Sequence, residues 1–141
     1  MINSEFPETC RANEYDWSDV TEPLTKEQLD KWLVALRTKD YTKGNGNLKQ
    51  TINDETCHCV LGVLGEEEGK LSITDEYQRA DKHIFRYSFI DHYGYESELG
   101  HTSGYYYMPR NMQQDIYSLN DDTFREASFS ELADEIERWF Q

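Results

Sequence analysis

Apolar residues recur at helical spacing in two stretches, one near each end of the chain. In residues 25–39 they fall at positions i, i+3, i+4 and i+7, and Thr25 with Gln28 forms a capping box that satisfies backbone N–H groups of the first turn. In residues 128–140, Ser128 stands three residues before a glutamate, in the same arrangement. The two stripes consist of Leu29, Trp32, Leu33 and Leu36, and of Phe129, Leu132, Ala133, Ile136, Trp139 and Phe140. Each stretch is therefore predicted to form an amphipathic helix.

Shorter elements are predicted between these two helices. The apolar run at 57–68 indicates a short buried helix, because a strand this apolar is usually richer in β-branched residues. Residues 81–90 alternate in the manner of a strand, and residues 105–107 predict a second strand. Pro109 suits the first turn of a helix that reaches about Tyr117. The pattern predicts an α+β fold in which several helices pack on a small antiparallel sheet.

The length of 141 residues fits one domain with an acidic extension. Residues 1–24 hold six acids against Arg11 alone and are predicted to form a loosely packed N-terminal arm, ahead of a single α+β domain at 25–141. No apolar run approaches the length of a membrane span, and the start of the chain lacks the pattern of a secretion signal. We therefore expect no membrane contact and a cytoplasmic location, in which the three cysteines stay reduced.

Five short motifs follow one another from residue 25 to the end of the chain. They are Trp32-x-x-Ala35-Leu36-Arg37, Tyr41-x-Lys43-Gly44-x-Gly46-x-Leu48, Cys59-Val60-Leu61-Gly62-Val63-Leu64, Asn120-Asp121 and Ser128-Phe129-x-Glu131-Leu132-Ala133-Asp134-x-Ile136-Glu137. In this order they resemble the pattern of a family of small proteins found largely in bacteriophage and prophage genomes. That pattern has a second cysteine where this chain has Val60, and an isoleucine where it has Leu132. The resemblance implies a setting, the cytoplasm of an infected host, and no mechanism.

Charge indicates the class of partner. Acidic side chains outnumber basic ones by 28 to 14, which gives a net charge of −14 and excludes direct nonspecific binding to a phosphate backbone. Ten tyrosines add the kind of side chain that dominates interface hot spots. The candidate partner-binding residues combine both types: Glu66, Glu67, Glu68, Tyr105, Tyr106, Tyr107, Asp121, Asp122, Glu131, Asp134 and Glu135.

These observations favour a non-enzymatic, acidic phage accessory protein. We expect it to bind and modulate or inhibit a host protein that is basic or handles nucleic acid, such as a defence factor. DNA mimicry is one form of this hypothesis, and it requires most of the acids to gather on one face.

An alternative function rests on the one locally basic segment of the chain. Gly-Asn-Gly at 44–46 is able to form a backbone nest for an anion, although it more often provides a tight turn. The residues of this candidate site for an anionic nucleotide are Lys39, Tyr41, Lys43, Gly44, Gly46 and Lys49.

The sequence Cys57-His58-Cys59 raises two further alternatives, a zinc site and a cysteine nucleophile paired with His92 or His101. The apolar run that follows favours thiols buried as small hydrophobic groups. We therefore predict no metal, no cofactor and no catalytic residue, and a cysteine-dependent enzyme ranks third among the functions.

Overall fold

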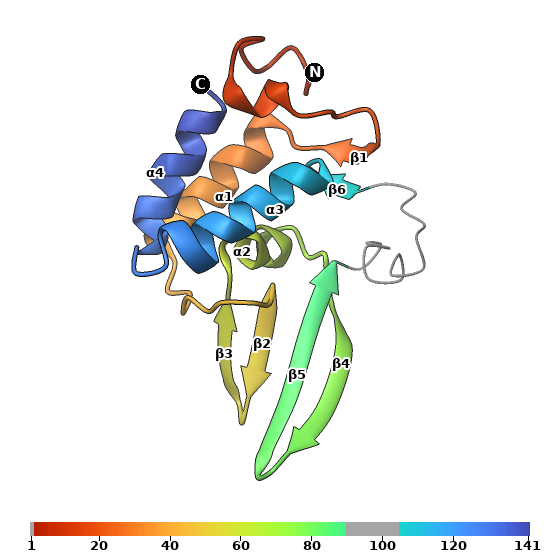
Figure 1. Cartoon of the computed structure of the whole chain (residues 1–141), viewed down its shortest axis with the longest axis vertical. Coiled ribbons are helices and arrows are strands. Elements are labelled where there is room, and N and C mark those ends of the chain that lie inside the picture. The colour runs from red at the N-terminus through yellow and green to blue at the C-terminus, as the bar shows by residue number, and fades with distance from the viewer. Residues whose placement is uncertain (1, 90–104) are drawn as a thin grey trace.

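The computed structural model describes residues 2–89 and 105–141. A body of helices occupies one end of the molecule, and a four-stranded sheet extends from it (Figure 1). Helices make up 41% of the chain and strands 24%, so the predicted α+β class is confirmed. Every helix in the described part of the chain is too short or too polar to cross a bilayer.

The two helices predicted most strongly are present, with the expected caps. The helices are α1 (Lys26–Thr38), α2 (Val60–Glu67), α3 (Arg110–Ser118) and α4 (Phe129–Trp139), with a 3-10 turn η1 (Arg11–Glu14) and a π-helical turn η3 (Leu119–Thr123). Thr25 Oγ1 accepts a hydrogen bond from Gln28 N at 3.1 Å, and Thr25 N donates to Gln28 Oε1 at 2.9 Å. Ser128 Oγ accepts from the backbone N–H of Glu131 at 3.2 Å. The capping signals in the sequence therefore mark the true helix starts.

The core lies where α1, α2, α3 and α4 meet. The apolar stripes of α1 and α4 face each other across it, and both Trp32 and Trp139 are almost fully buried. Trp32 Nε1 donates to the carbonyl of Val60 at 2.9 Å, which satisfies the indole and fixes α1 against the start of α2. All of the α2 residues from Val60 to Gly65 are buried, so the prediction of a short buried helix is confirmed for this part of residues 57–68.

The four-stranded sheet has the order β3-β2-β5-β4, and each neighbouring pair is antiparallel. Its strands are β2 (Lys49–Ile52), β3 (Glu55–His58), β4 (Leu71–Arg79) and β5 (Lys82–Phe89). Only β5 is predicted by the alternation of the sequence. Strands β2, β3 and β4 carry mixed polar residues because the helices meet this sheet only at its end near α2, and neither face is sealed by a described helix (Figure 1).

The strand predicted at residues 105–107 is present, but its place in the sheet and the packing of the N-terminal segment differ from the sequence expectations. Residues 105–107 form β6 (Tyr105–Tyr107), but this strand pairs in parallel with β1 (Val20–Pro23) and does not join the antiparallel sheet. The acidic segment 1–24 is not a loose arm, because six of its apolar side chains enter the core. They are Ile2, Phe6, Cys10, Ala12, Trp17 and Leu24, each at most 6% exposed.

Candidate functional site

The acidic triplet Glu66–Glu68 at the end of α2 lies against the basic segment that the sequence offered as a separate site. Lys49 Nζ is 2.8 Å from Glu66 Oε1, and Lys39 Nζ is 2.8 Å from Glu67 Oε1. Burial alone would raise the pKa of Glu67, but the hydrogen bonds from Lys39 and Tyr41 outweigh it and hold that pKa below its usual value. These carboxylates are therefore used within the chain, and a partner does not meet them as bare charge.

The remaining contacts of the predicted anion site are also made inside the chain. Tyr41 Oη donates to Glu67 Oε2 at 2.5 Å, and the N–H of Gly46 donates to Asp121 Oδ2 at 3.2 Å. Lys43 Nζ lies 2.7 Å from the carbonyl oxygen of Arg125 and also binds the carbonyls of residues 120 and 124. The chain's own carboxylates and carbonyls take the places of the expected ligand. Residues 39–49 thus make these contacts within the chain, and their use as a nucleotide site stays a prediction.

Asn120 joins three of the sequence motifs at one buried point. Its side chain is 0% exposed, and Asn120 Oδ1 accepts from the N–H of Val60 at 3.1 Å, at the start of α2. Asn120 Nδ2 donates to the carbonyl of Gly44 at 3.0 Å and to Asp121 Oδ1 at 2.7 Å. The glycine loop, the start of α2 and turn η3 are thereby fixed together. Three of the sequence motifs therefore meet at one structural junction. Sequence reasoning did not assign this role to Asn120.

Gly62 explains the apolar motif in α2. A Cβ at this position would lie 1.6 Å from the carbonyl oxygen of Leu48, far inside van der Waals contact. The same oxygen accepts a hydrogen bond from the N–H of Cys59 at 3.0 Å. The chain ahead of β2 thus runs directly against the surface of α2, at a distance that only glycine permits.

The Cys57-His58-Cys59 sequence does not converge on a metal or a nucleophile. Cys57 and His58 are neighbours in β3 and point to opposite faces, and Cys59 is fully buried where α2 begins. No group of metal-binding side chains occurs among the described residues. Burial raises the pKa of Cys57 and raises that of Cys59 to about 12, so both thiols stay protonated. The suggested partners His92 and His101 lie outside the described residues.

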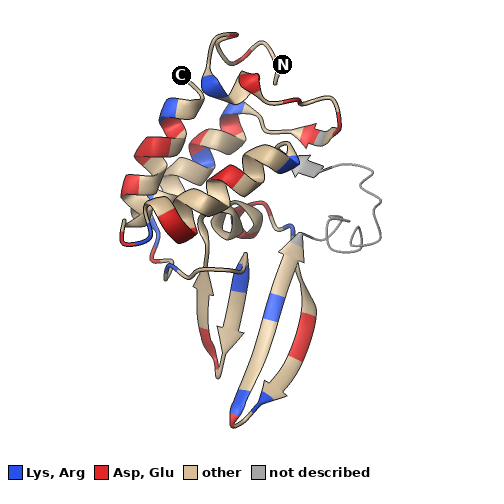
Figure 2. Ribbon diagram, viewed as in Figure 1, with Lys and Arg blue, Asp and Glu red and all other residues tan. Residues whose placement is uncertain are grey.

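The acids predicted on the C-terminal part of the chain are only partly free. Asp122 and Glu131 are exposed, whereas Asp121 is held by Asn120 and Gly46. Arg37 NH2 binds Asp134 Oδ1 at 2.8 Å and also binds Glu137, and Glu135 pairs with Arg138. Acidic side chains nevertheless occur along α4 and along the N-terminal segment, whereas the sheet carries mixed charges (Figure 2).

The predicted tyrosine patch is corrected at one residue. Tyr107 is 1% exposed and belongs to the core, so it is unavailable to a partner. The side chains of Tyr105 and Tyr106 lie outside what the structure describes. Tyr77 and Tyr87 are half-buried on the sheet, away from the acidic helices. Of the described tyrosines, Tyr15 stands among several carboxylates on the molecular surface.

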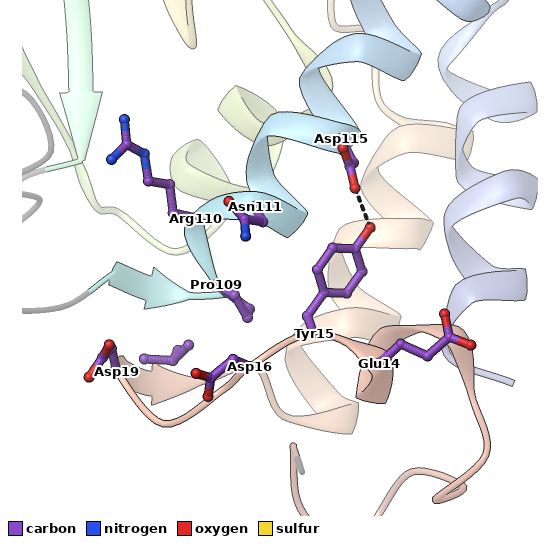
Figure 3. A pocket seen from close by; sticks show the side chains of 9 residues that line it. Glu14, Tyr15, Asp16, Asp19, Pro109, Arg110, Asn111 and Asp115 are labelled. Atoms are coloured by element: carbon purple, nitrogen blue, oxygen red, sulfur yellow. Dashed lines mark hydrogen bonds between the residues drawn. The ribbon is translucent and has the colours of Figure 1, made fainter.

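Tyr15 belongs to a cavity that sequence reasoning missed. The cavity has a volume of about 490 Å³ and lies between the N-terminal segment and the first turns of α3 (Figure 3). It is lined by Glu14, Tyr15, Asp16, Asp19, Val20, Pro109, Arg110, Asn111 and Asp115. Four of these residues are acidic and one is basic. At about 490 Å³ this acidic cavity is larger than two other cavities of about 340 Å³, one lined by Asp122, Glu126 and Glu131 and the other by Glu5 and Glu137.

Local hydrogen bonds hold the acidic cavity in shape. Tyr15 Oη donates to Asp115 Oδ2 at 2.5 Å, and the Tyr15 ring stacks against Trp139 with centroids 6.3 Å apart (Figure 3). Burial, together with the bond to Asp115, raises the pKa of Tyr15 to about 12, so its hydroxyl is a donor at neutral pH. Asp16 accepts from the backbone N–H of Ser18 at 3.0 Å, which lowers the pKa of Asp16. These contacts hold Tyr15, Asp16 and Asp115 in a fixed wall of the cavity.

Comparison with family models, with curated proteins and with solved structures gave no match. The resemblance to phage and prophage proteins therefore stays a prediction from the motifs.

Proposed function

We propose that this chain is a non-enzymatic accessory protein that binds a basic partner protein, and that the acidic cavity accepts a lysine or arginine side chain of that partner. The observation that carries the proposal is the set of four carboxylates and one tyrosine ring around a concave site, with Arg110 as the one basic residue lining it. A cation in this cavity lies beside the Tyr15 ring and within the field of the carboxylates that are spread along the cavity wall.

Concavity matters because isolated surface charges contribute little to affinity. An exposed ion pair is worth about 0–1 kcal/mol, since water and salt screen it. A partner side chain that enters a cavity loses part of its hydration water. Its Coulomb attraction to a carboxylate about 4 Å away then rises towards roughly 4 kcal/mol at an intermediate dielectric constant, before the cost of desolvation is subtracted. An ion pair made inside the acidic cavity is therefore expected to contribute more than one made at an exposed position on a helix.

The acidic surface of the helical body supplies the second part of the proposal. Outside the four-stranded sheet, the described residues hold 20 acidic and ten basic side chains, a balance of −10. This field attracts a basic protein from a distance and speeds association, while the cavity fixes the position of the complex. Proteins that handle nucleic acid are a host class with suitable basic surfaces, and the resemblance of the motifs to phage proteins supports a meeting in an infected cell.

Recognition of a basic side chain is favoured over wholesale DNA mimicry. Arg37 pairs with Asp134 and Glu137, and Arg138 pairs with Glu135, so the acidic face of α4 is partly neutralised. A mimic of duplex DNA needs an unbroken row of about one charge per 1.7 Å. Binding of one basic side chain in the acidic cavity does not require such a row of charges.

Capture from a bacterial lysate with charge-matched variants tests the proposal. The variant Asp16→Asn/Asp19→Asn removes two charges from the cavity, and Asp54→Asn/Glu55→Gln removes two exposed charges from the turn between β2 and β3. We expect the wild type and the sheet variant to retain the same basic proteins at low salt, and the cavity variant to lose most of them. High salt should release the partners from all three proteins. Equal capture by the two variants would contradict the proposal.

A further inference from the structure

One face of the four-stranded sheet carries apolar side chains among polar ones, and the described residues cover it only at the end near α2, where His58 is 5% exposed and Leu71 packs against the core. This aromatic face consists of Leu71, Ile73, Phe85, Tyr87, Lys49 and Thr51, which the strand register places on the same side. Ile73 is 51% exposed, and it is one of two large aliphatic side chains in the described chain that stand out in water, with Val34 on α1 at 56%. The helices meet the sheet only at one end, away from most of this face (Figure 1).

The few charged groups of the aromatic face are paired. Lys49 Nζ is 2.8 Å from Glu66 Oε1 and lies 4.4 Å from the centroid of the Tyr87 ring. On the same side, Glu76 Oε2 is 3.0 Å from His83 Nε2. The face therefore presents rings and methyl groups beside local ion pairs, with no surplus charge of its own.

The sheet as a whole differs in charge from the rest of the molecule. Residues 49–58 and 71–89 hold four basic and five acidic side chains, a balance of −1, against −10 for the other described residues. A second copy of this chain is repelled wherever acidic helical bodies approach each other. The sheet is the region where two copies are able to meet without bringing surplus negative charge together (Figure 2).

We propose that the aromatic face is an interface between two copies of this chain, which stack their sheets face to face about a twofold axis. A sheet with one open apolar face is completed in this way, and the two inner faces lie about 10 Å apart. In this arrangement Ile73 and the Phe85 and Tyr87 rings of each copy are removed from water, and the acidic bodies point away from the contact.

The size of the face sets the expected strength. The paired part of β4 and β5 is eight residues long, or about 26 Å, and the four strands span about 14 Å, which gives a projected area of roughly 400 Å² for an incomplete rectangle. That size corresponds to the lower end of specific interfaces, which bury less than about 1,200 Å² in total. We therefore expect a weak dimer that forms only at high protein concentration, which sedimentation equilibrium detects.

Sedimentation equilibrium of the purified full chain tests this interface with two matched variants. Ile73→Glu places a charge on the edge strand β4 of the aromatic face, and Val34→Glu places the same charge at a similarly exposed apolar position on α1. We expect the wild type and Val34→Glu to dimerise and Ile73→Glu to stay monomeric at the same concentration. Circular dichroism and thermal unfolding verify that each variant is folded. If Ile73→Glu does not fold, Ile73→Thr keeps the β-branch and should weaken the dimer several-fold.

Salt separates this proposal from the proposed function. Higher salt screens the repulsion between the acidic bodies and should strengthen the dimer, whereas it should weaken binding to a basic partner. A monomeric wild type at the highest concentration, or equal effects of Ile73→Glu and Val34→Glu, would overturn the interface and leave the acidic cavity unaffected.

Discussion

Replacement of Gly62 by alanine tests the packing of α2 against the chain ahead of β2. Helix propensity alone predicts that Gly62→Ala stabilises the protein by about 1 kcal/mol, because Gly62 lies inside α2. The structure predicts the opposite sign. The new Cβ would lie 1.6 Å from the Leu48 carbonyl oxygen, where real contacts stay above 3.0 Å, so helix and strand must separate by more than an ångström.

The cost of that separation is set by the two backbones that must move. Overpacking a core lowers the free energy of unfolding by about 1–3 kcal/mol where side chains can adjust. A clash with a backbone carbonyl oxygen should cost at least the upper value of this range, because the backbone itself must move. We therefore expect a loss of about 3 kcal/mol, or a fall of about 10 °C in Tm for a chain of this size. Gly69→Ala is the control, because its Cβ meets nothing within 4 Å and only its φ of +65° opposes the change. It should cost about 1 kcal/mol.

Urea denaturation of the three proteins measures these differences directly. A Gly62→Ala protein as stable as the wild type would refute the close approach of α2 to Leu48. It would also remove the structural explanation of the motif from Cys59 to Leu64.

The remaining predictions concern the buried junction, pH and the cavity. Asn120→Ala leaves the carbonyl of Gly44 without its donor and should cost about 2–4 kcal/mol in urea denaturation, whereas an unchanged midpoint would contradict the role of this junction. Burial lowers the pKa of His58, so the unfolded chain takes up a proton first, and stability should fall as the pH drops below about 6.5. His58→Gln should flatten that slope in thermal unfolding; a variant with the slope of the wild type would be the contrary result. Tyr15→Phe removes the hydrogen bond to Asp115 and should cost about 1 kcal/mol, while a larger loss would indicate a structural role beyond that bond.

Local sequence signals predicted the helical half of this fold, but within the four-stranded sheet they predicted only β5. Thr25 and Ser128 cap helices whose apolar stripes face a core, so spacing and capping agree with the tertiary structure. Strand β4 has no clean alternation, because it carries a register shift between Ile73 and Asp75 and packs under no described helix. A strand that is not buried on one side has no need to alternate apolar and polar residues, so this alternation cannot predict it from the sequence.

The candidate sites show a different limit of sequence reasoning. Charge composition indicated an acidic triplet at 66–68 and a basic segment at 39–49, but not that they lie together and neutralise each other. The acidic cavity was missed because Tyr15 and Asp115 are 100 residues apart in the chain. Its N-terminal half did leave a signal, since residues 14–19 combine three acids with two aromatic residues. Because the side chain of Trp17 is buried in the core, residues 14–19 are held in place as one wall of the cavity and do not form a loose arm.

The central claim is that the acidic cavity receives a cationic side chain. Titration of isotope-labelled protein with a short arginine-containing peptide, followed by amide chemical shifts, tests it most directly. We expect the largest shifts at residues 14–19 and 110–115, with saturation that Asp16→Asn/Asp19→Asn weakens several-fold and Asp54→Asn/Glu55→Gln leaves unchanged. Shifts spread evenly over the acidic helices, or centred on α4, would contradict the account.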